Sequence, residues 1–156
     1  INKSKTGSIF QIDKITFIIN RNELVITDNY ATLKVHKKLR FCHNLLWFSG
    51  QFKSKNRNRG YLSTSKNKFI IPNTLYQDGL YIRPWKFGDR IISYTSQKHV
   101  LLSDLYINNK LSKYEKLTQP VMVDVHDTIF WVPGLMHAKI NYNNRETVKV
   151  IKWIKG

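Results

Sequence analysis

The chain has 156 residues, 42% of them hydrophobic, which is enough to bury roughly 70% of the surface of the unfolded chain in one compact domain. Its 26 lysines and arginines against 10 aspartates and glutamates give a net charge of +16. No window approaches the ~20 apolar residues of a membrane span, no signal peptide is recognisable, and the single cysteine, Cys42, cannot form an internal disulfide. We therefore expect a cytoplasmic protein with no membrane partner.

The N-terminal half predicts mainly strands. Residues 15–20 and 24–27 are rich in Ile, Phe, Thr and Val and flank a short polar segment, which predicts a hairpin. Residues 40–48 form an apolar and aromatic run that predicts a buried strand, whereas residues 49–60 are polar and basic with two glycines, which predicts a loop. Two further short strands are expected at residues 68–72 and 80–83, followed by a turn at Pro84 and Gly88-Asp89.

Helical patterns appear only after residue 99. The leucines within residues 100–110 recur at helical spacing and predict one amphipathic helix. A second short helix is predicted to begin at Ser112, because Ser112 and Glu115 have the spacing of a capping box, in which each side chain satisfies a free backbone N–H group. This helix should end before Pro120.

The C-terminal third returns to strand patterns. Residues 121–125 and 128–132 predict a hairpin, and residues 137–142 and 146–154 flank an Asn-Asn pair that favours a tight turn. The predicted fold class is therefore α+β, a mainly antiparallel β-sandwich-like domain with one or two short helices.

Positive charge is concentrated in the sequence. Between Asp28 and Asp78 there is no acidic residue. This window contains ten basic residues: Lys34, Lys37, Lys38, Arg40, Lys53, Lys55, Arg57, Arg59, Lys66 and Lys68. Self-repulsion of this size is typical of proteins that bind a polyanion, and nucleic acid is the first candidate. An AT-rich genome, which favours Lys, Asn and Ile codons, is the alternative explanation.

The sequence offers no catalytic, metal or nucleotide site. Cys42 and His43 would point to opposite faces of a strand and cannot share a metal easily. The other histidines lack the paired spacing of ligand sets, and no glycine-rich loop joins a strand to a helix. The four histidines in question are His36, His99, His126 and His137. We therefore interpret the chain as a binding module without a catalytic residue, metal or cofactor of its own.

The tryptophans divide into two kinds. Trp131 and Trp153 lie within apolar strands and are expected in the core. Trp85 lies between Pro84 and Lys86 in a basic segment, where an aromatic ring could contact a nucleic-acid backbone or an unpaired base.

From residue 80 onward, five motifs occur in order over about 55 residues. They are the run Leu80-Tyr-Ile-Arg-Pro-Trp-Lys-Phe-Gly-Asp-Arg90, Leu102-Ser-Asp-Leu105, Lys110-Leu111, Pro120, and Trp131-Val-Pro-Gly-Leu135. This arrangement resembles the C-terminal domain of bacterial tRNA(Ile)-lysidine synthetases. Residues 80–156 correspond to the tRNA-binding region of that domain, and residues 1–79 to a variable, basic and β-rich lead-in.

The resemblance implies a full-length ligase that uses ATP and Mg²⁺ to activate the wobble cytidine of an isoleucine tRNA with a CAU anticodon, and then attaches lysine to it. In that family the chemistry belongs to an N-terminal α/β domain with an SGGxDS loop. The Ser49-Gly50 pair of this chain is followed by Gln51-Phe52, so the catalytic domain is not in this sequence. The fragment should be inactive alone, and the family's C-terminal region folds as a layered β-sandwich with helices.

By this resemblance we expect the domain to hold the acceptor arm of the tRNA through phosphate contacts, which position a nucleic acid without specifying its sequence. The expected contacts are Arg83, Lys86, Arg90, Lys98, Lys110, Lys113 and Lys116. Asp89 and Asp104 are assigned structural roles. The chain departs from the family in lacking a Gly and a Lys-Lys pair near Lys98, and in having Lys116 in place of a frequent Arg, which loses the bidentate fork.

Two alternatives remain open from the sequence. The first is a structural or dimerisation module with little tRNA contact, whose mark would be a large apolar surface patch and a self-interface. The second is a small basic nuclease, which would require carboxylates or histidines that converge in a cleft.

Overall fold

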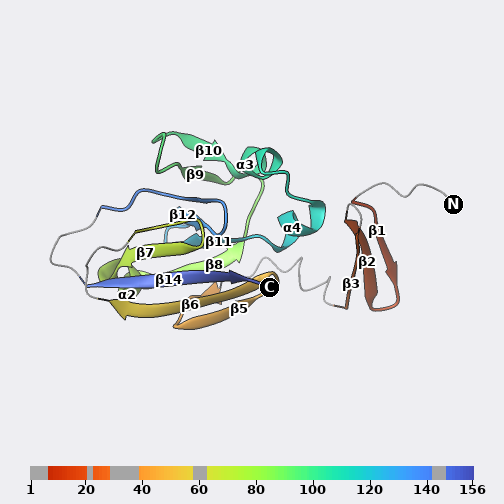
Figure 1. Cartoon of the computed structure of the whole chain (residues 1–156), viewed down its shortest axis with the longest axis horizontal. Coiled ribbons are helices and arrows are strands. Elements are labelled where there is room, and N and C mark those ends of the chain that lie inside the picture. The colour runs from red at the N-terminus through yellow and green to blue at the C-terminus, as the bar shows by residue number, and fades with distance from the viewer. Residues whose placement is uncertain (1–6, 21–22, 29–38, 58–62, 142–146) are drawn as a thin grey trace.

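The computed structural model describes residues 7–20, 23–28, 39–57, 63–141 and 147–156 (Figure 1). Two β-sheets pack face to face, short helices cover the end and the far side of this sandwich, and a small third sheet stands beside it. The predicted α+β fold, with mainly antiparallel sheets, is confirmed. No helix within these described ranges has the length and apolar character to span a membrane.

The central sheet has the order β10-β9-β12-β11-β8-β4, with β13 beside β12. Its strands are β4 (Leu39–Arg40), β8 (Tyr81–Pro84), β9 (Arg90–Ile92), β10 (His99–Leu101), β11 (Pro120–Val123), β12 (Ile129–Val132) and β13 (Met136–His137). All neighbours are antiparallel except β12 and β9, which pair in parallel through Ile129 and Ile91.

The outer sheet has the order β5-β6-β14-β7 and is antiparallel throughout. Its strands are β5 (Asn44–Trp47), β6 (Gly50–Arg57), β7 (Lys68–Pro72) and β14 (Val148–Lys155). The N-terminal sheet has the order β1-β2-β3, from β1 (Ile9–Ile12), β2 (Ile15–Asn20) and β3 (Glu23–Thr27). The helices are α2 (Asn73–Gly79), α3 (Leu102–Asn108) and α4 (Lys113–Thr118).

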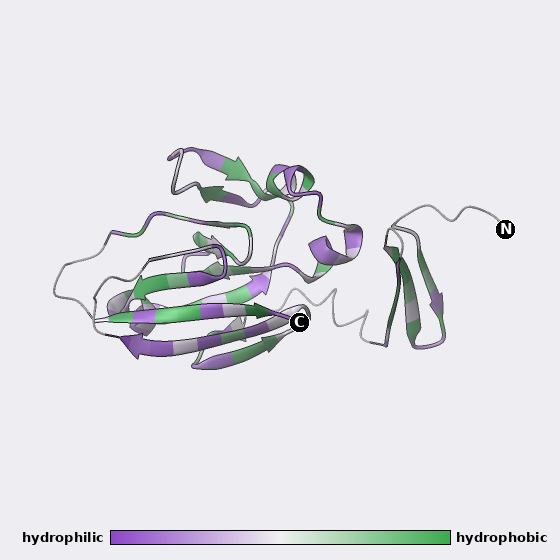
Figure 2. Cartoon of the chain, viewed as in Figure 1, coloured by the Kyte–Doolittle hydropathy of each residue, from purple (hydrophilic) through white to green (hydrophobic). Residues whose placement is uncertain are grey.

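The main core lies between the central and outer sheets. Trp131 of β12 is fully buried there, with its ring stacked on Phe69 of β7 (5.5 Å between centroids) and edge-on to Phe52 of β6 (5.9 Å). A second core lies on the other face of the central sheet, where Leu102 and Tyr106 of α3 are fully buried. The outer sheet, the central sheet and α3 therefore form three successive layers. Figure 2 shows green, hydrophobic bands between purple ones along the strands of the sandwich.

Two predictions from the first half of the sequence are wrong. Residues 50–57, expected within a loop, form β6, which pairs along its whole length with β14 and also with β5. Only alternate residues of β6 face the core, so its composition is polar although it lies inside a sheet. The expected single strand at residues 40–48 is interrupted, because β4 joins the central sheet and β5 joins the outer one. Leu46 is 82% exposed.

The predicted strand pair around the Asn-Asn turn is also wrong. The turn itself, at residues 142–146, lies outside the described residues, but β14 pairs with β6 and β7 whereas β13 pairs with β12. Each sheet therefore combines strands from before and after residue 80, because β4 forms one edge of the central sheet and β14 lies between β6 and β7 in the outer sheet. The hairpins at residues 15–27 and 120–132 are confirmed. The structure adds β1 and α2, and it starts α3 at Leu102 because residues 99–101 pair with β9.

Candidate nucleic-acid interface

A buried ion pair holds the turn between β8 and β9. The Nη1 and Nη2 atoms of Arg83 donate to the two carboxylate oxygens of Asp89 at 2.8 and 3.0 Å, and Nε donates to Oδ1 of Asp127 at 2.9 Å. The backbone N–H of Lys86 also donates to Asp89 (2.7 Å), and the carbonyl of Asp89 accepts from the backbone N–H of Leu102 at the start of α3. Asp89 thus fixes the turn and the arginine through its carboxylate, and the start of α3 through its backbone carbonyl.

Arg83 lies inside the domain. It is only 2% exposed. Burial alone would lower the pKa of its guanidinium, but the hydrogen bonds and charges of Asp89 and Asp127 raise that pKa above its ordinary value, so Arg83 stays cationic. A guanidinium enclosed and bonded in this way cannot reach a phosphate. We therefore assign Arg83 a positioning role instead of the direct tRNA contact expected from the sequence, and Asp89 takes the structural role expected for it.

The other six expected contacts lie on the turns beside β9, at the start of β9, and on or next to α3 and α4. Lys86 and Arg90 flank the β8–β9 turn, Lys98 lies in the β9–β10 turn, Lys110 follows α3, and Lys113 and Lys116 belong to α4. All except the half-buried Lys116 are exposed. Nζ of Lys86 lies 3.4 Å from Asp127, and Nζ of Lys113 donates to the Gly7 carbonyl.

The aromatic ring exposed beside these cations is Phe87, not Trp85. The ring of Trp85 packs edge-on against Tyr106 (5.1 Å between centroids), and its indole N–H donates to the Lys116 carbonyl at 2.8 Å. Phe87, at the tip of the same turn, is 95% exposed. The half-buried Trp85 ring thus holds α4 against the central sheet, so Phe87 is better placed than Trp85 to contact a nucleic acid.

Helix α4 is fixed at both ends. At its start, the predicted capping box is confirmed: the Ser112 hydroxyl accepts from the Glu115 backbone N–H (3.2 Å) and the Glu115 carboxylate accepts from the Ser112 N–H (2.8 Å). At its end, the indole N–H of Trp47 and the hydroxyl of Ser49 both donate to the Thr118 carbonyl. Lys113 and Lys116 are therefore presented on a helix with a defined position.

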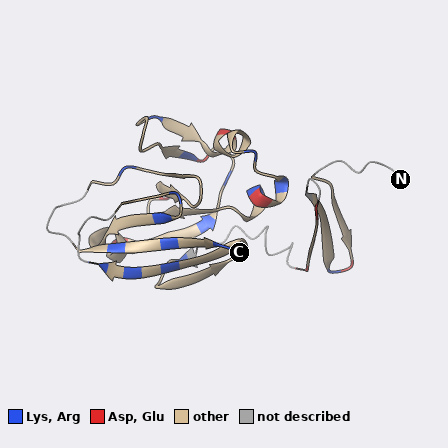
Figure 3. Ribbon diagram, viewed as in Figure 1, with Lys and Arg blue, Asp and Glu red and all other residues tan. Residues whose placement is uncertain are grey.

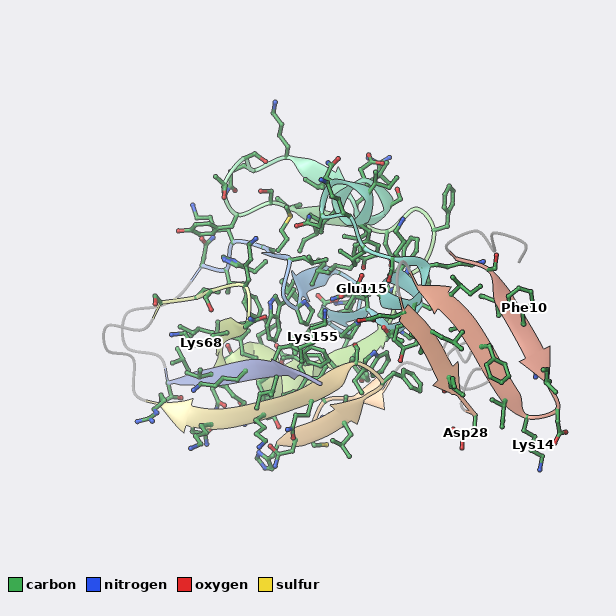
Figure 4. All side chains as sticks on the ribbon, turned by 45° about the vertical axis from the view of Figure 1, so that its right-hand side comes forward. Phe10, Lys14, Asp28, Lys68, Glu115 and Lys155 are labelled. Carbon is green, nitrogen blue, oxygen red and sulfur yellow. The ribbon has the colours of Figure 1, made fainter. Side chains whose placement is uncertain are left out.

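The cap depends on the charge of Glu115. Burial raises the pKa of Glu115, but the hydrogen bonds from Ser112 and the ion pair with Lys155, at 3.3 Å, more than offset it, so the net pKa is lowered (Figure 4). A carboxylate whose pKa is lower in the folded than in the unfolded state adds stability above its unfolded pKa. This stabilisation is lost as the pH falls through the lowered value.

A second set of cations lies on the outer sheet. Lys152 of β14 is directly opposite Lys53 of β6 on one side and Lys68 of β7 on the other. We call these three residues the lysine row. Lys55 and Arg57 continue the same face along β6, and Figure 3 shows the resulting blue bands across β6 and β14. The four strands contain no aspartate or glutamate.

Sequence reasoning identified only part of this face. Lys53 and Lys68 belong to the acid-free window, but Lys152 lies about a hundred positions away from Lys53 along the chain, and no local signal pairs the two. Lys149, on the same strand as Lys152, faces inward instead: its Nζ lies 3.5 Å from the centroid of the Tyr76 ring, and burial lowers its pKa. Alternation along β14 thus separates the surface lysine from the buried one.

The chemistry of a nuclease finds little support in the described part of the chain. A surface hollow of about 530 Å³ contains His99 together with Asp89 and Asp127, but both carboxylates are bonded to Arg83. No group of three or more His, Cys, Asp and Glu side chains in the described ranges could hold a metal ion. The geometry defines a binding surface more readily than a reaction centre.

The chain is therefore an α+β sandwich domain with cations on the turns and helices around the central sheet and on the outer sheet. No protein-family model matches the chain. It is 35% identical over 74 residues to the tRNA(Ile)-lysidine synthase of Oceanobacillus iheyensis, and 33% identical over 61 residues to that of Shouchella clausii. These matches cover 47% and 39% of this chain but only 16% and 13% of the relatives.

The structure also matches a crystal structure of a TilS C-terminal domain, TilS being tRNA(Ile)-lysidine synthase. The TM-score is 0.66 at 19% identity, over 76% of this chain and 98% of the solved one. The resemblance to the C-terminal domain of tRNA(Ile)-lysidine synthetases is therefore confirmed, in sequence by the two relatives and in fold by the solved domain. The segments that match this chain make up less than a fifth of the length of the two lysidine synthases.

Proposed function

We propose that this domain binds the acceptor arm of an isoleucine tRNA with a CAU anticodon, on behalf of a full-length ATP-dependent tRNA(Ile)-lysidine synthetase acting in the cytoplasm. ATP and Mg²⁺ would be bound by an N-terminal catalytic domain, and the chain by itself would be inactive. The sequence similarity to lysidine synthases supports the enzyme class. In this enzyme the domain would position the tRNA substrate for the catalytic domain.

The observation that carries this proposal is the placement of six cations on rigid supports. The β8–β9 turn, which presents Lys86, is fixed by the buried Arg83–Asp89 pair, and α4, which presents Lys113, is fixed by its cap and by two indole hydrogen bonds. Supports of this kind reduce the entropy lost when side chains contact phosphates. The exposed Phe87 beside Lys86 is suited to stack on a base of the unpaired acceptor end.

The test is a titration of the domain with tRNA(Ile) bearing the CAU anticodon and with an elongator methionine tRNA, read by fluorescence anisotropy across a salt series. We expect a steep loss of affinity with salt, because several phosphate contacts release counterions. We also expect tighter binding of tRNA(Ile), which would come from contacts to bases at the acceptor end, since phosphate contacts do not specify sequence. The assay contains only the domain and one tRNA, without ATP, lysine or a catalytic domain, so it measures binding apart from catalysis.

A second candidate function is self-association, and one observation favours it. The register of the N-terminal sheet places seven apolar side chains on one face: Phe10, Ile12, Ile15, Phe17, Ile19, Leu24 and Ile26. Five of these are exposed, and Figure 4 labels Phe10. Exposed apolar faces of this kind mark interaction sites.

We propose a second copy of the chain as the partner of this apolar face. The face carries no charged side chain, and the described residues of the sheet contain Lys14 against Asp13, Glu23 and Asp28. A second copy of a chain with net charge +16 can approach here with the least repulsion, and a flat apolar face is complementary to itself in a two-fold dimer.

Replacing Ile26 with lysine should shift this chain from dimer to monomer in sedimentation velocity, because a charge would be buried at the interface. Ile107→Lys is the matched control, since Ile26 and Ile107 are 60% and 61% exposed and Ile107 lies on α3. A wild-type chain that sediments as a monomer at 100 μM would exclude this candidate.

A further inference from the structure

The outer face of the β5-β6-β14-β7 sheet has no role in the proposal above. Its three central strands place Lys53, Lys152 and Lys68 directly opposite one another. Strands in a sheet lie about 4.8 Å apart, and like charges directly opposite one another destabilise a sheet. No acidic side chain on the four strands offsets this repulsion. An anion bound across the row would relieve this repulsion.

We infer that this face binds the sugar–phosphate backbone of double-stranded RNA. The inference rests on the proposed function, because both require the domain to bind RNA. The lysine row crosses the strands, and Lys55 and Arg57 extend it along β6, so the cations form a two-dimensional array and not a single point charge. An array of this kind suits the repeating phosphates of a nucleic-acid backbone.

In the described part of the outer sheet, the lack of aromatic side chains between the cations favours double-stranded over single-stranded RNA as the partner. By the strand register, the described residues on the outer face of these four strands include no aromatic side chain. Proteins that bind single strands without sequence preference stack bases on aromatic rings in a basic groove. The aromatic residues Phe52, Phe69 and Trp153 all point inward to the core. A duplex, whose bases are already stacked, needs only contacts to its backbone.

This face is separate from the surface on α3 and α4. The outer sheet packs on one face of the central sheet and α3 packs on the opposite face, so the lysine row and α3 lie on opposite sides of the sandwich (Figure 1). Helix α4 lies at the end of the sandwich, where it is bonded to Ser49 and Lys155. One short stem cannot cover both the lysine row and α3. The lysine row therefore contacts a different double-stranded part of the RNA, and its effect should add to that of the first surface.

The test is the double variant Lys53→Gln/Lys152→Gln, which removes two facing charges and keeps most of each side-chain stem. We expect the Kd for tRNA to rise at least about ten-fold at 0.1 M salt and the slope of log K against log salt to become shallower by about 2. The preference for tRNA(Ile) over the methionine tRNA should be unchanged, because backbone contacts carry no sequence information. The unfolding midpoint should be unchanged or higher.

The matched control is Lys14→Gln/Lys139→Gln, which removes the same charge at two exposed lysines outside the outer sheet. If both double variants weaken tRNA binding equally, net charge is responsible and the inference is wrong, while the proposed function stands. The inference is also wrong if oligo(U) competes with tRNA for the wild-type domain as well as an RNA duplex does. A wild-type domain that binds no tRNA at low salt would overturn the proposed function as well.

Discussion

Replacing Arg83 with methionine is expected to lower the free energy of unfolding by about 3–5 kcal/mol, the usual cost of removing one partner from a buried ion pair. The carboxylate of Asp89 accepts two hydrogen bonds from the guanidinium and would stay behind, largely buried, without them. Asp127 would lose its bond to Nε. Chemical denaturation followed by tryptophan fluorescence measures the change.

Two further variants make this prediction specific. Lys86→Met makes the same kind of change at an exposed cation of the same cluster, and it should cost less than about 1 kcal/mol. Arg83→Lys should not restore stability, because one ammonium group cannot form the fork to Asp89 and also reach Asp127. Equal stability of Arg83→Met and Lys86→Met would show that the buried pair does not hold the β8–β9 turn.

Replacing Trp131 with alanine should also cost about 3–5 kcal/mol, as expected for loss of a fully buried aromatic side chain. Its ring contacts Phe69 and Phe52 of the opposite sheet, and its indole N–H donates to the Lys66 carbonyl at 3.1 Å. This residue therefore joins the central sheet to the outer sheet that carries the lysine row. The measurement is the same denaturation curve, followed by circular dichroism.

Trp131→Phe separates the two contributions of this side chain. Phenylalanine keeps most of the apolar contact and loses the hydrogen bond, so its cost should be smaller than that of alanine and include about 1 kcal/mol or more for the unpaired carbonyl. An alanine variant within 1 kcal/mol of the wild type would contradict the view that Trp131 is central to the core.

Local signals in the sequence predicted local structure well. The spacing of Ser112 and Glu115 gave the capping box of α4, and alternating apolar residues gave the hairpins at residues 15–27 and 120–132. The strand β6 was missed because its partner is β14, and no property of residues 50–57 alone indicates a strand that lies beside residues 148–155. Pairings of high sequence separation have no local signature.

The same limit explains the errors at the site. Arg83 was expected on the surface because arginine usually is, but its partner Asp127 is 44 positions away and the two meet only through the β8–β11–β12 pairing. Trp85 and Phe87 are two residues apart in one turn, and only the position of α4 decides that the first ring is covered and the second exposed. The resemblance to lysidine synthetases supplied the enzyme class, which the charge pattern could not.

The titration of the domain with the two tRNAs tests the central claim most directly. If the six cations on the β8–β9 and β9–β10 turns, α3 and α4 contact phosphates, log K should fall with log salt with a slope steeper than about −3. If the domain also contacts bases of the acceptor end, as proposed for Phe87, tRNA(Ile) should bind more tightly at every salt concentration. Binding that is steep but equal for both tRNAs would reduce the domain to a general electrostatic contact. No binding at low salt would contradict the proposal that this domain holds tRNA.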